Sequence, residues 1–239
     1  QRYGAPGVPK EGEGQIDGVK ADLSVSEPIY GNAGESERQV SLILDAKSRK
    51  ALGLDFGDFL QCEFPVVMNE LDEGRRRVEA DLKNARLYQP AVGLDKPPGS
   101  PATFAAILSP DAETGGTRLS DIRLSGRELF VSGSGLVRAH GQIAALDLDT
   151  FRLQGDDSAR MSVRTDKGGN FNVEIEAVRF DMRRVLDNAK TGGLAEGGAR
   201  SGDTRRYKVA AVIGSARGYN GEILQSVDID LDMKGDDIR

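Results

Sequence analysis

The stretch LSDIRLSGRELFVSGSG, residues 119–135, decides the fold class. It predicts two short strands, Leu119–Leu124 and Glu128–Val131, joined by a turn at Ser125-Gly126. Side chains in a strand alternate between two faces, so apolar residues at every second position share one face. Those residues are Ile122 and Leu124 in the first strand, and Leu129 and Val131 in the second. The stretch therefore indicates an antiparallel sheet with one apolar face and no active-site motif.

The same alternation recurs along most of the chain, which predicts about a dozen further strands. The alternating segments are 19–25, 40–44, 64–68, 78–82, 104–108, 146–148, 151–153, 161–163, 171–175, 178–180, 207–213 and 227–233. Turn-forming Gly and Asx residues separate many of them, at 72–74, 125–126, 155–157, 167–169 and 218–221. The chain has 30 glycines among 239 residues, which is typical of many tight turns.

Helix is scarce in the sequence. Asp45–Leu52 predicts a short helix with Asp45 as N-cap and Gly53 as its stop, and residues 181–190 predict another. Two short helices cannot cover a dozen one-sided strands, so the apolar face needs a second sheet or a sheet that curls on itself. Gly133 and Gly214, inside predicted strands, would permit bending. We therefore predict a mainly β fold: a highly curved, mostly antiparallel sheet, either an open half-pipe or barrel-like, with two short helices.

The predicted organisation has four parts. Residues 1–34 are a loose N-terminal edge segment, 35–190 a curved β-sheet module with the two helices, 191–202 a Gly-rich loop, and 203–239 continuing strands. The sequence starts without Met and stops inside a predicted strand. We expect it to be a fragment of a longer protein.

Charge and cysteine content argue against several classes of binding partner and against an intrachain disulfide. The net charge of −6 without basic clusters argues against nucleic acid and anionic membrane surfaces as partners. The single cysteine, Cys62, allows no intrachain disulfide, and its surroundings favour a buried structural thiol. No run of about 20 apolar residues is present, and no signal peptide opens the chain.

Candidate catalytic groups are few. The single histidine, His140, lies in a predicted turn without a nearby nucleophile. Asp228, Asp230 and Asp232 alternate along the last strand, where they are more typical of a solvated face than of a metal site, because they lack the spacing of a calcium loop. The sequence thus predicts no enzyme activity, no metal and no cofactor.

Two uses of the apolar face remain. The face is either the filled core of a β-sandwich or an apolar groove for acyl chains. The predicted groove-lining residues are Val40, Leu42, Phe64, Val66, Val78, Leu82, Ile122, Leu124, Leu129, Val131, Leu146, Leu148, Met161, Val163, Phe171, Val173, Ile175, Val209, Ile213, Val227, Ile229 and Leu231.

From Leu52 onward the chain resembles the AsmA-like proteins of Gram-negative envelopes, specifically the large YhdP-type branch of alphaproteobacteria. The resemblance rests on four passages in the same order: ALGLDFGDFLQCEFPVVM, DLKNARLYQPAVGLDKPPGSPATFAAIL, the meander from TRLSDIRL to MRRVL, and YKVAAVIGSARGYNG with the strand that follows it. It covers about three-quarters of the chain and consists of strand-and-turn patterns, not catalytic signatures.

The resemblance implies a C-terminal-region fragment of a periplasmic protein that is anchored in the inner membrane outside this sequence. Such proteins form long curled sheets with an apolar inner surface. They are thought to carry phospholipids toward the outer membrane without an enzymatic step. The expected partners are therefore phospholipids and other envelope proteins. The alternative is a structural module for outer-membrane biogenesis with a filled core.

Overall fold

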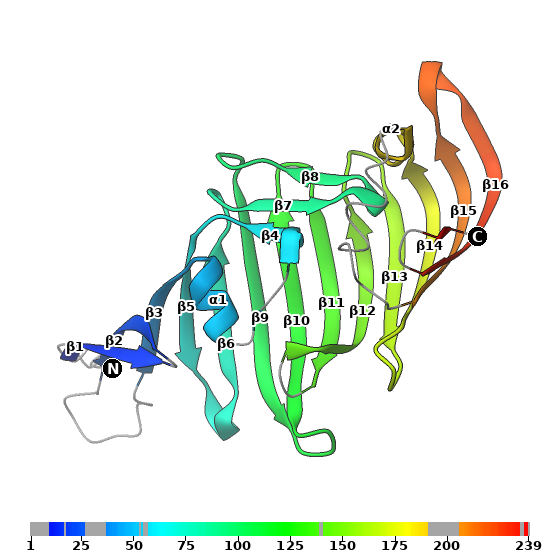
Figure 1. The fold of residues 1–239 in the computed structure, drawn as a ribbon. Helices are drawn as coiled ribbons and strands as arrows, with labels where there is room; N and C mark the ends of the chain where they lie inside the picture. Colours follow the sequence, from blue (N-terminus) through cyan, green and yellow to red (C-terminus); the bar gives the residue numbers. More distant parts are fainter. Residues whose placement is uncertain are drawn as a thin grey trace, which may run out of the picture.

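A computed structural model describes residues 10–16, 18–26, 37–52, 54, 57–138, 141–190, 206–234 and 237–238. Fourteen strands form one large sheet, in the order β1-β2-β3-β5-β6-β9-β10-β11-β12-β13-β14-β15-β16-β17 (Figure 1). The sheet is curved, and its first and last strands are not paired with each other, so it is not closed into a barrel. The predicted mainly β, mostly antiparallel curved sheet with two short helices is confirmed.

The longest strands of the large sheet lie in its middle and in its C-terminal half. From the N-terminus, the strands of the large sheet are β1 (Lys10–Ile16), β2 (Val19–Ser26), β3 (Glu37–Leu44), β5 (Phe64–Glu70), β6 (Arg76–Asp81), β9 (Ala102–Asp111), β10 (Gly116–Gly126), β11 (Phe130–Val137), β12 (Ile143–Arg152), β13 (Ser158–Thr165), β14 (Phe171–Asp181), β15 (Arg206–Arg217), β16 (Ile223–Lys234) and β17 (Asp237–Ile238). Neighbouring strands are antiparallel except for β14 and β15. The predicted loose segment 1–34 thus contains an edge strand and the strand beside it.

The connection between the parallel strands β14 and β15 contains helix α2 (Arg183–Lys190). This helix begins two residues later than predicted, because β14 continues to Asp181. The Asp181 carboxylate accepts a hydrogen bond from the Arg183 backbone N–H at 3.1 Å. The predicted Gly-rich loop at 191–202 lies outside the described residues.

Helix α1 (Ala46–Ala51) confirms the predicted first helix and its cap. The Asp45 carboxylate accepts a hydrogen bond from the Ser48 backbone N–H at 2.7 Å. Hydrogen bonds from the Ser48 side chain and from the Ser48 backbone N–H lower the pKa of Asp45, because they stabilise the charged carboxylate. Gly53, the predicted stop, lies outside the described residues.

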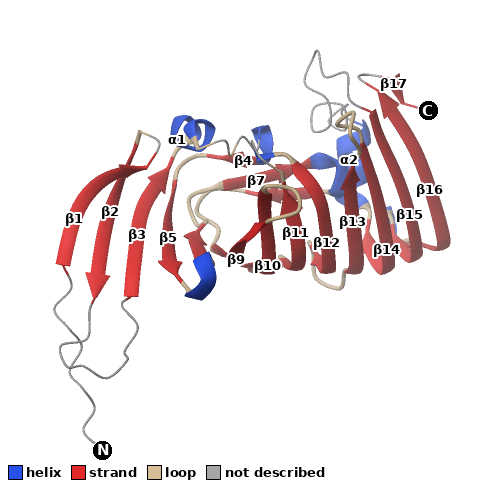
Figure 2. Cartoon of the chain, turned by 90° about the horizontal axis from the view of Figure 1, so that it is seen from below, coloured by secondary structure: helices blue, strands red, loops and turns tan. Residues whose placement is uncertain are grey.

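A second, three-stranded sheet was not predicted. It consists of β4 (Leu60–Gln61), β7 (Arg86–Gln89) and β8 (Leu94–Lys96), with the 3-10 turn η3 (Pro90–Val92) between the last two. We call these four elements the cap, because β7 and β8 cross one end of the large sheet (Figure 1). Seen from below, the large sheet follows an arc, and the cap and both helices lie on its inner side (Figure 2).

The predicted turn at Ser125-Gly126 is wrong. Strand β10 continues to Gly126, and the chain reverses at Arg127 and Glu128. The reversal is closed by a hydrogen bond from the Gly126 N–H to the Leu129 carbonyl at 2.7 Å. The strands still pair in the expected antiparallel manner, with Leu124 opposite Val131.

Irregular positions bend the central strands. The register between β10 and its neighbours shifts at Asp121, which has a left-handed φ of 50°. Another shift, between β11 and β12, falls at Gly133. A Cβ atom on Gly133 would lie 2.0 Å from the carbonyl oxygen of Asp147, so only glycine permits this close approach of two backbones.

We predict that Gly133→Ala lowers the free energy of unfolding by about 1–3 kcal/mol, because the added methyl group forces the β11 and β12 backbones apart. Gly14→Ala in strand β1 is the matched control, since a Cβ there meets nothing within 4 Å. Urea denaturation followed by circular dichroism measures both. Equal stability of the two variants would show that the backbones do not meet at Gly133.

Candidate functional site: the apolar face

The pairing registers of the strands align the apolar side chains into three rows that cross the large sheet. We number the rows starting from the one nearest the cap. The first row contains Leu42, Val66, Ala80, Phe104, Leu124, Val131, Phe151, Ala159, Ala177, Ile213 and Val227. The second contains Val40, Met68, Val78, Ile122, Leu148, Met161, Ile175, Ala211 and Ile229. The third contains Leu108, Leu119, Leu146, Val163, Val173, Val209 and Leu231. The three rows form one continuous apolar face.

Most of the first row is buried. Its side chains belong to one core cluster with Leu87 and Leu94 of the cap and with Ala85, which directly precedes β7. Ala85 and Leu87 are 0% and 2% exposed. Pro90 in the cap is also fully buried. The cap therefore fills this end of the apolar face with solid packing.

Two buried cations bind backbone carbonyls at the end of the sheet where the cap lies. Arg49 of α1 is 5% exposed, and its guanidinium donates to the carbonyls of Leu44 (3.2 Å), Cys62 (2.7 Å) and Leu60 (2.9 Å). It thereby joins α1, β3 and β4. The same group lies 5.6 Å from the centre of the Phe64 ring. Backbone carbonyls thus take the place of water around this charge.

Lys96 of β8 is buried in a comparable way. Its ammonium donates to the carbonyl of Ala85 at 2.7 Å and to those of Pro97 and Lys83 at 3.2 and 3.3 Å. Burial lowers the pKa of Lys96, because the charged form loses its hydration. The ammonium holds together the chain segments that enter and leave the cap.

The third row and much of the second are half-buried, unlike the first. Val163, Val173, Val209 and Leu231 each keep part of their surface exposed. The face on the other side of the sheet, which we call the outer face, is mostly polar, although Ile43 and Val212 are exposed on it. It carries cross-strand ion pairs such as Arg160 with Glu176 (2.5 Å) and Arg164 with Asp147 (2.6 Å). The large sheet thus has one charged face and one apolar face, and the cap covers only part of the apolar one.

The structure places all the predicted lining residues on the apolar face, but in two environments. Leu42, Phe64, Val66, Leu82, Ile122, Leu129, Val131, Leu148 and Ile213 are buried. Val40, Val78, Leu124, Leu146, Met161, Val163, Phe171, Val173, Ile175, Val209, Val227, Ile229 and Leu231 are half-buried. Only the second group offers surface to a ligand.

Sequence reasoning missed the residues that divide the face in this way. Cap strands of two to four residues are too short to show alternation, and Arg49 resembles an ordinary basic residue of a solvated helix. The segment ARLYQ, residues 85–89, has no period-two alternation long enough to predict a covering sheet. Lys96 beside two prolines gave no sign of burial either.

The other candidate groups do not form a site. Cys62 is exposed, so the expectation of a buried thiol is wrong; the chain turns there with a φ of 67°. His140 lies outside the described residues. Asp228 and Asp230 are exposed on the outer face, and no group of three or more His, Cys, Asp or Glu side chains within the described ranges could hold a metal.

A shallow hollow occurs at the N-terminal end of the sheet. Its lining consists mainly of outer-face residues, among them Glu11, Glu13 and Asp22. Three carboxylates line this hollow of about 570 Å³, so both apolar and anionic ligands would bind poorly there. The hollow is therefore a poor site for an acyl chain.

Comparison of the chain with protein-family models, with curated proteins and with solved structures found no match to any of them. Within the described residues, no helix has the length and apolar character needed to cross a lipid bilayer.

We predict that Arg49→Met lowers the free energy of unfolding by about 1–3 kcal/mol, because three buried carbonyls lose their donor. Lys50→Met is the control: Lys50 is exposed, and we expect a change within about 0.5 kcal/mol. Urea denaturation measures both. An Arg49→Met protein as stable as the Lys50→Met protein would contradict the role assigned to the buried guanidinium.

Proposed function

We propose that this chain binds phospholipid acyl chains on the exposed part of its apolar face and passes them along between the inner and outer membranes. In this proposal it is the periplasmic part of an AsmA-like envelope protein that is anchored in the inner membrane. The observation that carries the proposal is the half-buried third row, which runs from β9 to β16; of its apolar side chains, Leu146 alone packs against the core cluster of the described residues.

The side chains of this row suit acyl chains. They are all Leu and Val, so their van der Waals contacts do not depend on the orientation of the ligand. Each acyl methylene that leaves water contributes about 0.8 kcal/mol to the free energy of binding. Neighbouring positions along the row, such as Val163, Val173 and Val209, are chemically equivalent. An acyl chain can therefore move from strand to strand without losing its contacts. Such transfer requires no catalytic group, and we propose no enzymatic step.

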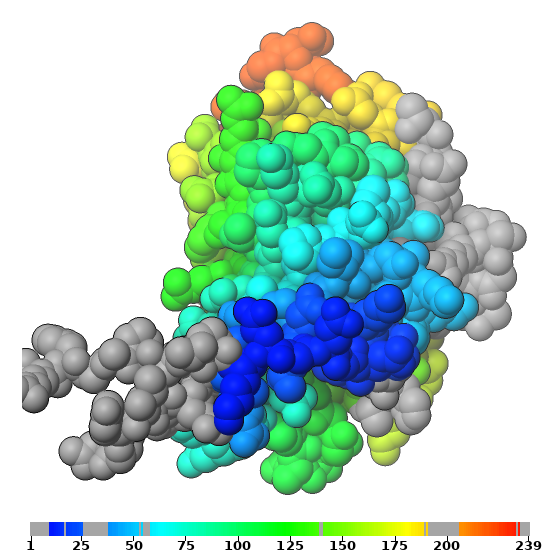
Figure 3. Space-filling model, turned by 90° about the vertical axis from the view of Figure 1, so that its left-hand side faces the viewer, coloured from blue at the N-terminus to red at the C-terminus, as the bar shows by residue number. Residues whose placement is uncertain are grey.

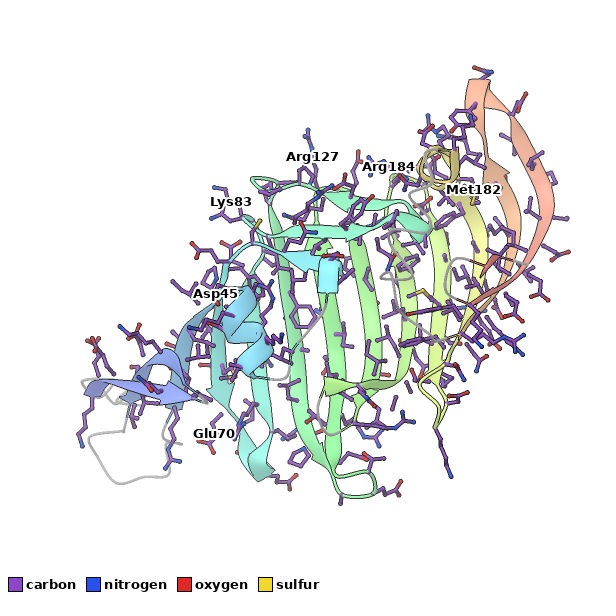
Figure 4. All side chains as sticks on the ribbon, viewed as in Figure 1. Asp45, Glu70, Lys83, Arg127, Met182 and Arg184 are labelled. Carbon is purple, nitrogen blue, oxygen red and sulfur yellow. The ribbon has the colours of Figure 1, made fainter. Side chains whose placement is uncertain are left out.

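The cap end supplies cations for a head group. Lys83, Arg127 and Arg184 lie around this end of the sheet (Figure 4), and all three are exposed. None has an ion pair with another described residue. Arginine and lysine bind phosphate oxygens well. These cations support the binding of a lipid whose phosphate lies near the cap.

One observation favours the alternative, a structural module with a filled core. The cap packs onto the first row and leaves Ala85 and Leu87 without exposed surface. If the remaining rows were covered in the same way by another part of the envelope machinery, the sheet would act as a spacer. The two functions differ in whether lipid contacts the third row.

Photo-crosslinking distinguishes them. We predict that a photoreactive residue in place of Val173, which is half-buried on the apolar face, forms adducts with phospholipid in cells. The same residue at Glu174, the next position but exposed on the outer face, is the matched control and should form none. Mass spectrometry identifies the adducts. Protein adducts at Val173 with no lipid would favour the spacer.

A charge on the third row should block binding. We predict that Val173→Arg reduces the phospholipid that co-purifies with the protein by at least tenfold, because an unpaired charge in an apolar site costs several kcal/mol, about 1.4 kcal/mol being tenfold. Glu174→Arg is the control and should retain lipid. Native mass spectrometry measures both, and thermal denaturation checks folding. Unchanged lipid in folded Val173→Arg protein would refute the proposal.

A further inference from the structure

On β14 and β15 the apolar face ends in a pair of aromatic side chains, at the end of the sheet opposite the cap. Phe171 is the first residue of β14 and Tyr207 the second residue of β15, and they lie opposite each other in the parallel register. Both strands run from this end toward the cap end, where α2 follows β14 (Figure 1). Figure 3 shows the two ends from the side, with the cap residues (blue-green) above the N-terminal strands (blue) and the β9–β10 turn (green) at the lower end.

The two rings are stacked, with their centroids 5.1 Å apart and an angle of 9° between their planes. Both are half-buried. The next pair of residues toward the cap on this face is Val173 and Val209, which belong to the third row. Side chains in a strand stand roughly perpendicular to the sheet, and an aromatic ring is longer than a valine side chain. The aromatic pair therefore rises above the third row as a step.

The packed core bounds the same strand at its other end. Ala177, six positions further along β14, belongs to the core cluster that includes Leu87 of the cap. A strand covers about 20 Å over that distance. Between the two boundaries Val173 and Ile175 keep part of their surface exposed. The exposed apolar surface above β14 thus has a limited length, with solid packing at one end and the aromatic pair at the other.

The neighbouring strand β13 ends on the same line. Its last residue, Thr165, lies opposite Phe171 and is only 9% exposed. Among the described residues, the Thr165 hydroxyl has no hydrogen-bond partner. An acyl chain that extended from Val163 to Thr165 would contact a polar atom with which it cannot form a hydrogen bond. Favourable apolar contact on β13 therefore ends at the same row as on β14 and β15.

We propose that Phe171 and Tyr207 form an end wall that limits the length of the acyl chains bound on the apolar face. The inference rests on the proposed function and specifies its ligand: phospholipids whose acyl chains, with the phosphate near the cap, end before the aromatic pair. A longer chain must bend or leave its last methylenes in water, so each of them adds nothing to binding. A bounded apolar site can discriminate about tenfold or more for one methylene.

A mixture of three lipids with one head group tests the proposal. The protein is incubated with equal amounts of dimyristoyl, dipalmitoyl and distearoyl phosphatidylcholine in one detergent, and native mass spectrometry measures the bound lipids. We expect the wild-type protein to bind the dimyristoyl lipid in preference to the distearoyl lipid. The double substitution Phe171→Ala with Tyr207→Ala should raise the ratio of bound distearoyl to dimyristoyl lipid at least tenfold, because it removes the wall.

Two single variants complete the test. Phe130→Ala is the matched control, because Phe130 is a half-buried aromatic residue on the outer face, opposite Arg152, and its loss should leave the lipid ratio unchanged. Val173→Phe places a ring one row closer to the cap, about 7 Å along the strand, and should shift binding further toward the dimyristoyl lipid. Circular dichroism checks the folding of each variant.

The outcomes separate this inference from the function on which it rests. A wild-type protein that binds none of the three lipids would overturn both. Lipid bound with the same chain-length ratio by the wild-type protein and the double variant would overturn the end wall alone, and would assign Phe171 and Tyr207 to packing. If the double variant does not fold, Val173→Phe decides: an unchanged lipid ratio in that variant would contradict the proposal.

Discussion

The structure depends on one constraint: a sheet with a continuous apolar face must have that face covered. The first row, nearest the cap, is covered by residues of the same chain. Leu42, Val66, Val131 and Ile213 pack in the same cluster as the cap residues, and all are less than 8% exposed. Farther from the cap, Val163, Val173 and Val209 stay half-buried and are not part of the core cluster of the described residues, while the apolar pattern continues across the sheet. The uncovered apolar surface is what makes an acyl-chain ligand a reasonable occupant.

The cap is held by unusual means. Arg49 and Lys96 are buried cations whose hydrogen bonds all go to backbone carbonyls. Such bonds require the carbonyls of Leu44, Leu60 and Cys62 to converge on the guanidinium of Arg49. They also require the carbonyls of Lys83, Ala85 and Pro97 to converge on the ammonium of Lys96, so they fix the cap in position as well as stabilise it. A cap fixed in this manner keeps the boundary between the packed and the exposed parts of the apolar face at a constant place.

The fold class could be predicted from the sequence because side-chain alternation has a period of two wherever a sheet has one apolar face. The register confirms that Leu124 and Val131 share a face, although the turn between their strands lies two residues later than the sequence suggested. The division of the face could not be predicted. It arises from contacts between Leu87 or Leu94 and strands distant in the sequence, and periodicity carries no information about such contacts. The buried state of Arg49 has the same origin.

Methyl NMR with a spin-labelled phospholipid tests the central claim most directly. In protein with labelled Leu and Val methyl groups, a phospholipid with a nitroxide on its acyl chain should broaden the signals of Val163, Val173 and Val209. The signals of Leu42 and Val131, which the cap region buries, should stay sharp. Broadening of neither group, or of both equally, would contradict the account that acyl chains occupy the exposed part of the apolar face.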